Sequence, residues 1–110
     1  MASIICVALA VYFESRGEPL AGQYAVASVV WNRVNDDRWP STACEVVFQE
    51  KQFAPIKHVA DPVAWYTAIK AASHTRYNPT TKAFFFATPG HHKKYKYLES
   101  IGNHNFFTVP

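Results

Sequence analysis

Cysteine, glycine and charged residues are all scarce in this 110-residue chain, and these shortages exclude several classes of protein. Two cysteines are too few for a disulfide-stapled scaffold or a four-ligand zinc site. No apolar run approaches the roughly 18 residues that a membrane-spanning helix requires. Charged residues make up 17% and apolar residues 49%, a balance that argues against a disordered chain. The length fits one domain.

Aromatic residues, by contrast, are abundant. Three Trp, six Tyr and eight Phe make up 15% of the chain, which exceeds what a small core needs and leaves rings to line a groove. Lys and Arg outnumber Asp and Glu by 11 to 8, and the net charge of +3 suits an anionic polymer as partner. A basic stretch that includes Lys93, Lys94 and Lys96 has two tyrosines interleaved. With so small a net charge we interpret it as a solvated loop and expect no nucleic-acid partner.

The hydrophobic pattern predicts a compact, helix-rich α+β fold in a single domain over residues 1–110, with a small β element. The apolar run at 4–13 is typical of a signal peptide, but no basic residue precedes it, so a buried first helix is favoured. Ser3 and Ser41 are the expected N-caps of the first and third helices, and Gly17 the stop of the first. The expected helices cover 3–16, 19–34, 42–48 and 61–77; a strand covers 83–87, a basic loop 91–96 and an extended piece 101–109.

Glu14 stands out among the acidic residues. No charged side chain precedes it, and it lies in the last turn of an almost wholly apolar segment. The C-terminal end of a helix repels negative charge, and partial burial also favours the uncharged acid. An acid that keeps its proton near neutral pH is what general-acid cleavage of a glycosidic bond requires. The alternative is a surface glutamate paired with a neighbouring cation such as Arg16 or Arg33.

A second catalytic carboxylate is not evident. Gly17 and Pro19 break the helix on either side of Glu18, so Glu18 is interpreted as an acid at the start of the second helix. The other acids have structural explanations as caps, turns or surface groups. A second catalytic carboxylate would be present only if the chain folded back to place Asp36, Asp37 or Glu50 in the groove beside Glu14.

The histidines and cysteines form no recognised metal or nucleophile motif. Side chains of the adjacent pair His91 and His92 diverge, and the HExxH and CxxC spacings are absent. Cys6 lies in the apolar first helix and is interpreted as a small buried hydrophobe, while Cys44 has no evident catalytic partners. We therefore expect no metal and no cofactor. Both cysteines are predicted to be free thiols in protein made in the reducing cytosol.

Residues 11–34, VYFESRGEPLAGQYAVASVVWNRV, resemble the opening motif of the cell wall hydrolase family typified by the spore cortex-lytic enzyme SleB. The family pattern is similar to Y-F-E-A-R-G-E-P, then G-Q-x-A-V-A-x-V, then N-R-V. Later stretches at 52–55, 83–89 and 101–107 are also similar to the family, in the same order. The resemblance thus spans nearly the whole chain.

The resemblance implies a lysozyme-like fold and cleavage of the peptidoglycan bond between N-acetylmuramic acid and N-acetylglucosamine. The catalytic glutamate of the family's F-E-[AS]-R-G-E motif maps onto Glu14. Family members are described as lytic transglycosylases, which need one general acid/base because the muramoyl 6-hydroxyl itself attacks the anomeric carbon. The alternative is a lysozyme-type hydrolase, which would need a second carboxylate about 5–9.5 Å away.

Five further residues are expected to contact the substrate, because they lie in the stretches that are similar to the family or have polar side chains. They are Tyr12, Gln52, Phe53, Thr88 and His104. The rings of Trp39 and Phe53 are candidates either for stacking on sugars or for core packing. The chain departs from the family at Ala54, where a hydroxyl residue is usual, and at 84–86, where three Phe replace tyrosines. Sugar-contacting hydroxyls are therefore missing or moved, and Thr88 or Tyr12 would have to compensate.

We expect the protein to act on bacterial peptidoglycan as a monomer. We do not expect it to insert into a membrane. A module of this size resembles a phage endolysin or virion lysin, made in the cytoplasm of an infected host or carried by the phage particle. A bacterial remodelling enzyme fits as well. The alternative from another class is a non-catalytic module that binds wall polymer or nucleic acid through residues 91–97.

Overall fold

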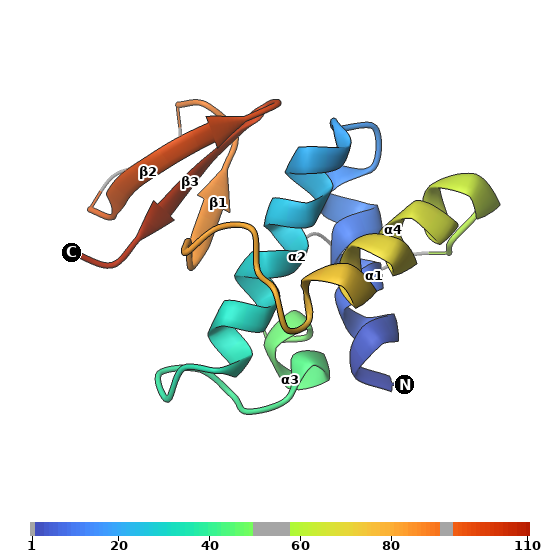
Figure 1. Ribbon diagram of the computed structural model, residues 1–110, viewed down its shortest axis with the longest axis horizontal. Coiled ribbons are helices and arrows are strands. Elements are labelled where there is room, and N and C mark those ends of the chain that lie inside the picture. The colour runs from blue at the N-terminus through green and yellow to red at the C-terminus, as the bar shows by residue number, and fades with distance from the viewer. Residues whose placement is uncertain (1, 50–57, 91–93) are drawn as a thin grey trace.

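The computed structural model describes residues 2–49, 58–90 and 94–110. Within these ranges the chain forms a helical layer and a three-stranded sheet that meet at one helix, α2 (Figure 1). The sheet lies on one side of α2, and the other helices lie on its opposite side. The predicted α+β arrangement is confirmed. The elements are α1 (Ala2–Ser15), α2 (Leu20–Val34), α3 (Ala43–Val47), α4 (Pro62–Thr75), β1 (Phe85–Ala87), β2 (Lys96–Ile101) and β3 (His104–Thr108).

The first helix is central because nearly all its side chains are apolar. Val7, Ala8 and Val11 have no exposed surface, and α1 contacts the other three helices. Small residues on α2 and α4, such as Ala27 and Ala71, are also fully buried, which lets the helices approach closely. The core therefore lies among the helices, and Phe106 of β3 joins it from the sheet.

The ends of the helices were predicted from capping residues, and two of the predicted caps are wrong. Gly17 stops α1 with φ +91°, as predicted, but α1 begins at Ala2, so Ser3 is not its cap. Asp61 caps α4 by accepting hydrogen bonds from the N–H groups of Val63 and Ala64, both at 3.1 Å. Ser41 was the wrong cap for α3.

The cap of α3 is Thr42, whose hydroxyl accepts the N–H of Glu45 at 3.2 Å. Thr42 also donates to the Glu45 carboxylate at 2.8 Å. Ser41 and Thr42 are both residue types that favour the N-cap position. The sequence alone therefore places the cap only to within one residue.

The sheet is antiparallel, with the order β1-β3-β2. The sequence predicted a strand over 83–87, which includes the whole of β1, and a single extended piece at 101–109, but β2 was missed. Its side chains are mostly exposed, so this edge strand lacks the buried apolar face on which strand prediction depends. Ile101 pairs with His104, which leaves Gly102 and Asn103 as a two-residue turn, and Gly102 has the positive φ of +59° that such turns use.

A disulfide links Cys6 of α1 to Cys44 of α3, with the Cα atoms 5.1 Å apart. The prediction of two free thiols is therefore wrong. Helices α1 and α3 pack against each other, and that packing brings together two cysteines separated by 38 positions in the sequence. Disulfides persist in oxidising compartments, so the bond also argues against the expected reducing cytosol.

None of the helices in the described ranges is both long and apolar enough to cross a lipid bilayer.

Candidate active site

Glu14 lies in the last turn of α1, beside the corner where the chain turns into α2 (Figure 1). Its neighbour Ser15 is 1% exposed and donates its hydroxyl proton to the carbonyl of Val11 at 2.8 Å. Glu14 itself is half-buried, because it sits one helical step away from this inward-facing side. Glu14 thus lies at the border between the helical core and the surface.

Tyr12 is a structural residue, which corrects the prediction that it contacts substrate. Its side chain is 1% exposed, and its hydroxyl oxygen accepts the backbone N–H groups of Ala60 and Asp61 at 3.1 and 2.9 Å. The guanidinium of Arg16 donates to the same oxygen and lies over the Tyr12 ring. The phenol therefore joins the end of α1 to the start of α4 and leaves no free surface for a sugar.

Glu18 has a role that sequence reasoning missed. Its Oε1 accepts the backbone N–H of Asn103 at 2.7 Å, and its carbonyl accepts a hydrogen bond from Gln23 Nε2 at 3.1 Å. A Cβ added at Gly102 would lie 2.3 Å from Glu18 Oε1 and 2.8 Å from Pro19 Cδ. This contact, the Glu18 clamp, holds the β2–β3 turn against the corner that follows Glu14. The sequence predicted one extended piece over 101–109, so it gave no signal of this turn or of what the turn faces.

The other acidic groups are mostly occupied by contacts within the protein. Of the eight acids, Glu50 lies outside the described residues, and six others are described besides Glu14. Asp37 is exposed beside Asp36. The remaining five each accept a hydrogen bond: Glu18 from Asn103, Asp36 from Arg38, Glu45 from Thr42, Asp61 from Val63 and Ala64, and Glu99 from Thr81.

Asp36, one of the acids considered as a partner, is far from Glu14. It follows α2, whose 15 residues separate it from the Glu14 corner. Two hydrogen bonds from the Arg38 guanidinium, at 2.8 and 2.7 Å, hold its carboxylate. The same hydrogen bonds lower the pKa of Asp36 to about 2. This carboxylate is thus bound to Arg38 at the end of α2 opposite to Glu14.

Four further residues were predicted to contact the substrate. Gln52 and Phe53 lie outside the described residues. Thr88 is exposed in the segment after β1, open to a ligand. His104 is 6% exposed at the start of β3, with its ring edge-on to Phe86 at 5.2 Å. Substrate contact by these four residues stays a prediction.

His104 Nδ1 is a buried nitrogen with no hydrogen-bond partner among the described residues. Such a group carries an uncompensated desolvation cost, and most buried polar atoms in proteins are paired. The structure gives a packing role to the ring, between Phe86 and Phe106, and leaves this nitrogen without an assigned role.

Trp39 packs within the protein on one face. Its ring is stacked on Phe84 with centroids 5.1 Å apart and planes at 8°. The buried Arg33 guanidinium lies over the Trp39 ring, and its Nε donates to the carbonyl of Phe84 at 2.7 Å. Burial lowers the pKa of Arg33 to about 10. Trp39 is still half-buried rather than covered, so one part of the ring remains at the surface.

The described residues contain no group of three or more His, Cys, Asp or Glu side chains placed to hold a metal ion.

Comparison with known proteins identifies the family. Residues 17–107 match the family model described as Cell Wall Hydrolase. The chain belongs to the cell wall hydrolase family. The matched residues begin just after Glu14, so the family match does not itself include that residue. It does include the Glu18 clamp at both of its ends.

Sequence relatives of this family member are spore cortex-lytic enzymes. One from Bacillus cereus is 37% identical over 89 residues, covering 76% of this chain and 33% of the relative. One from Oceanobacillus iheyensis is 46% identical over 59 residues, covering 54% of this chain and 20% of the relative. The chain therefore spans about a third or less of the length of these curated relatives.

Solved structures match almost the whole chain. The catalytic domain of the germination-specific lytic transglycosylase SleB from Bacillus anthracis has a TM-score of 0.76 and 32% identity, covering 96% of this chain and 93% of that one. The catalytic domain of the Bacillus cereus SleB protein has a TM-score of 0.76 and 31% identity, covering 96% and 89%. This member of the cell wall hydrolase family thus has the fold of a SleB catalytic domain.

Proposed function

We propose that residues 1–110 form a catalytic domain that cleaves the peptidoglycan glycan backbone between N-acetylmuramic acid and N-acetylglucosamine. The observation that carries the proposal is the position of Glu14, a half-buried acid at the end of a buried helix. The likeness to SleB catalytic domains over 96% of the chain supports the same assignment. Glu14 is the proposed catalytic residue.

The proposed reaction is a lytic transglycosylation with Glu14 as acid and then base. The protonated carboxyl donates its proton to the bridging oxygen as the bond from the muramoyl anomeric carbon to that oxygen breaks. The carboxylate then takes the proton of the muramoyl 6-hydroxyl as O6 bonds to the anomeric carbon. The products are a free N-acetylglucosamine hydroxyl and a 1,6-anhydromuramoyl end, and Glu14 regains its proton.

One-acid chemistry is supported by the contacts of the other carboxylates. Glu18 is engaged by the Asn103 N–H, and Asp36 is held by Arg38 beyond the far end of α2. An intramolecular hydroxyl as nucleophile also gains the proximity advantage of a tethered group, so no second acid is needed to activate water.

The substrate class and setting follow from the same proposal. The domain acts on bacterial peptidoglycan as a monomer, without a nucleic-acid partner. The Cys6–Cys44 disulfide supports folding in an oxidising environment outside the cytosol.

The substitution Glu14→Gln tests the proposal. Glutamine keeps the size of the side chain but cannot donate and retrieve a proton, so lysis of purified sacculi should fall by about 10²- to 10⁴-fold. Glu18→Gln is the matched control, because its amide oxygen can still accept the Asn103 N–H. Retention of more than about a tenth of the activity by Glu14→Gln would rule out Glu14 as the general acid.

A further inference from the structure

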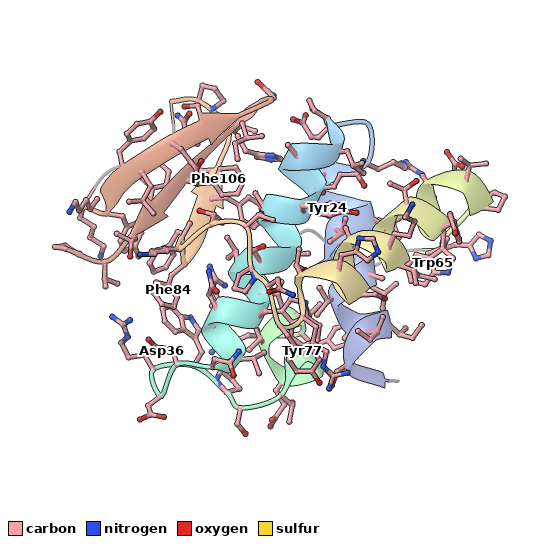
Figure 2. All side chains as sticks on the ribbon, in the orientation of Figure 1. Tyr24, Asp36, Trp65, Tyr77, Phe84 and Phe106 are labelled. Carbon is pink, nitrogen blue, oxygen red and sulfur yellow. A yellow bond between two sulfur atoms is a disulfide. The ribbon has the colours of Figure 1, made fainter. Side chains whose placement is uncertain are left out.

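An open pocket of about 730 Å³ lies at the end of α2 remote from Glu14. Its walls come from Asn32, Asn35 and Asp36 near the end of α2, from residues 79–82 and Phe84, and from Thr108 of β3. Asp36 and Phe84 lie together at this end of the molecule (Figure 2). With 15 residues in α2 rising about 1.5 Å each, the pocket is about 20 Å from the Glu14 corner. It is therefore separate from the proposed catalytic site.

Two asparagine amides in the pocket wall are oriented by the protein. Nδ2 of Asn32 donates to the carbonyl oxygens of Thr81 and Ala83, both at 2.9 Å. Nδ2 of Asn35 donates to the carbonyl of Trp31 at 2.9 Å. Because the amide nitrogens are committed, each side chain can present its Oδ1 to a ligand. An amide oxygen accepts hydrogen bonds, so the two Oδ1 atoms are candidate acceptors for the hydroxyl or amide protons of a ligand.

Phe84 supplies an apolar wall that is held rigidly. Its ring stacks on Trp39, and the Arg38 guanidinium lies 5.1 Å from its centroid. The ring is nevertheless half-buried rather than enclosed. A fixed aromatic ring beside oriented amide groups can receive the two kinds of surface that a sugar ring has, its C–H face and its hydroxyl rim.

The charges of the pocket favour an uncharged ligand. The two charged side chains in its wall are Asp36 and Lys82, which are opposite in sign. Arg38 already pairs with Asp36 at 2.7 Å, and Lys82 is exposed. A single exposed lysine is a weak site for a phosphate or a polyanion, which are recognised by several cations together.

We propose that this pocket binds an N-acetylhexosamine unit of the wall glycan, as a second saccharide site remote from the reacting bond. The choice of polymer rests on the proposed function. A second contact with the same polymer keeps the domain close to further bonds after each cleavage, because rebinding becomes effectively intramolecular. The pocket thus retains the enzyme on an insoluble substrate, while Glu14 performs the chemistry.

The test uses chitotetraose, a soluble N-acetylglucosamine tetramer, and the whole 110-residue protein. In ¹H–¹⁵N NMR titrations, amide shifts should gather at residues 32–36, 80–84 and 108. Asn35→Ala and Lys82→Ala should each weaken binding about 3- to 10-fold, the effect of one lost hydrogen bond. Lys70→Ala on α4 is the matched control and should bind as the wild type does. All three substituted residues are exposed, and the same spectra report whether each variant is folded.

Shifts confined to residues 18–24, next to Glu14, would overturn the proposal, as would the absence of shifts with chitotetraose. Pocket shifts with the dipeptide L-Ala-D-Glu and none with the sugar would assign the pocket to the acidic stem peptide instead. Lysis of sacculi is measured separately on the same variants. A protein that binds chitotetraose in the pocket but never cleaves sacculi would disprove the proposed function and leave the second site standing.

Discussion

At the scale of single residues, Glu18 connects two parts of the chain that are 85 positions apart. Its carboxylate accepts the Asn103 N–H, and the turn approaches so closely that only glycine fits at position 102. The corner that carries Glu14 and the sheet that faces α2 are therefore held in one arrangement. We therefore propose Glu18 as a positioning residue and Glu14 as the residue that contacts the reacting atoms.

Glu18→Ala should lower the free energy of unfolding by about 1 kcal/mol, the net value of one hydrogen bond to a partly exposed group. Glu18→Gln should retain most of that stability, because the amide oxygen replaces the carboxylate as acceptor. Thermal unfolding and sacculus lysis of both variants provide the check. Equal and complete loss of lysis in both variants, with unchanged melting temperatures, would make Glu18 a chemical partner of Glu14.

At the level of helices and strands, the sequence predicted those features that residues close together in the chain determine. The almost uniformly apolar 4–13 run indicated α1, Gly17 indicated its end, and Asp61-Pro62 indicated the start of α4. The polar edge strand β2 and the disulfide were missed. Both depend on packing between distant segments, which spacing along the chain does not encode.

The candidate site residues also differ in whether the nearby sequence is enough to interpret them. Glu14 stands out in the sequence because an acid at the C-terminal end of an apolar helix is poorly placed for the helix dipole, and its catalytic role stays a prediction. Tyr12 was misjudged, since a tyrosine next to a motif has the same sequence signal whether its hydroxyl faces a ligand or the backbone of Ala60 and Asp61. The second-site pocket draws on three segments and has no local signal at all.

The disulfide between α1 and α3 should form in protein folded under oxidising conditions. Alkylation of denatured protein without reductant should modify neither Cys6 nor Cys44. Reduction should then cost about 4 kcal/mol of stability, the chain-entropy value for a link across 38 positions. Denaturant unfolding with and without reductant measures the difference. Two alkylated cysteines in unreduced protein would show that the bond is absent.

At the scale of the whole molecule, the net charge of +3 should help the domain to approach an anionic wall. Lysis should weaken as salt rises, because screening reduces attraction beyond about 10 Å at 0.1 M ionic strength. Replacing Lys93, Lys94 and Lys96 together by Ser should flatten this salt dependence. Lys70→Ser, on α4, is the control for loss of an exposed lysine remote from that stretch. An unchanged salt profile in the triple variant would show that these three lysines have no role in the approach to the wall.

The central claim is that one acid, Glu14, cleaves the glycan with the substrate's own hydroxyl as acceptor. Mass spectrometry of sacculi digested by the wild-type protein tests it most directly. The predicted main product ends in a 1,6-anhydromuramoyl residue, lighter by one water than a hydrolytic end, because O6 rather than water closes on the anomeric carbon. Reducing muramic acid ends as the main product would contradict the account, since hydrolysis requires a second group to activate water.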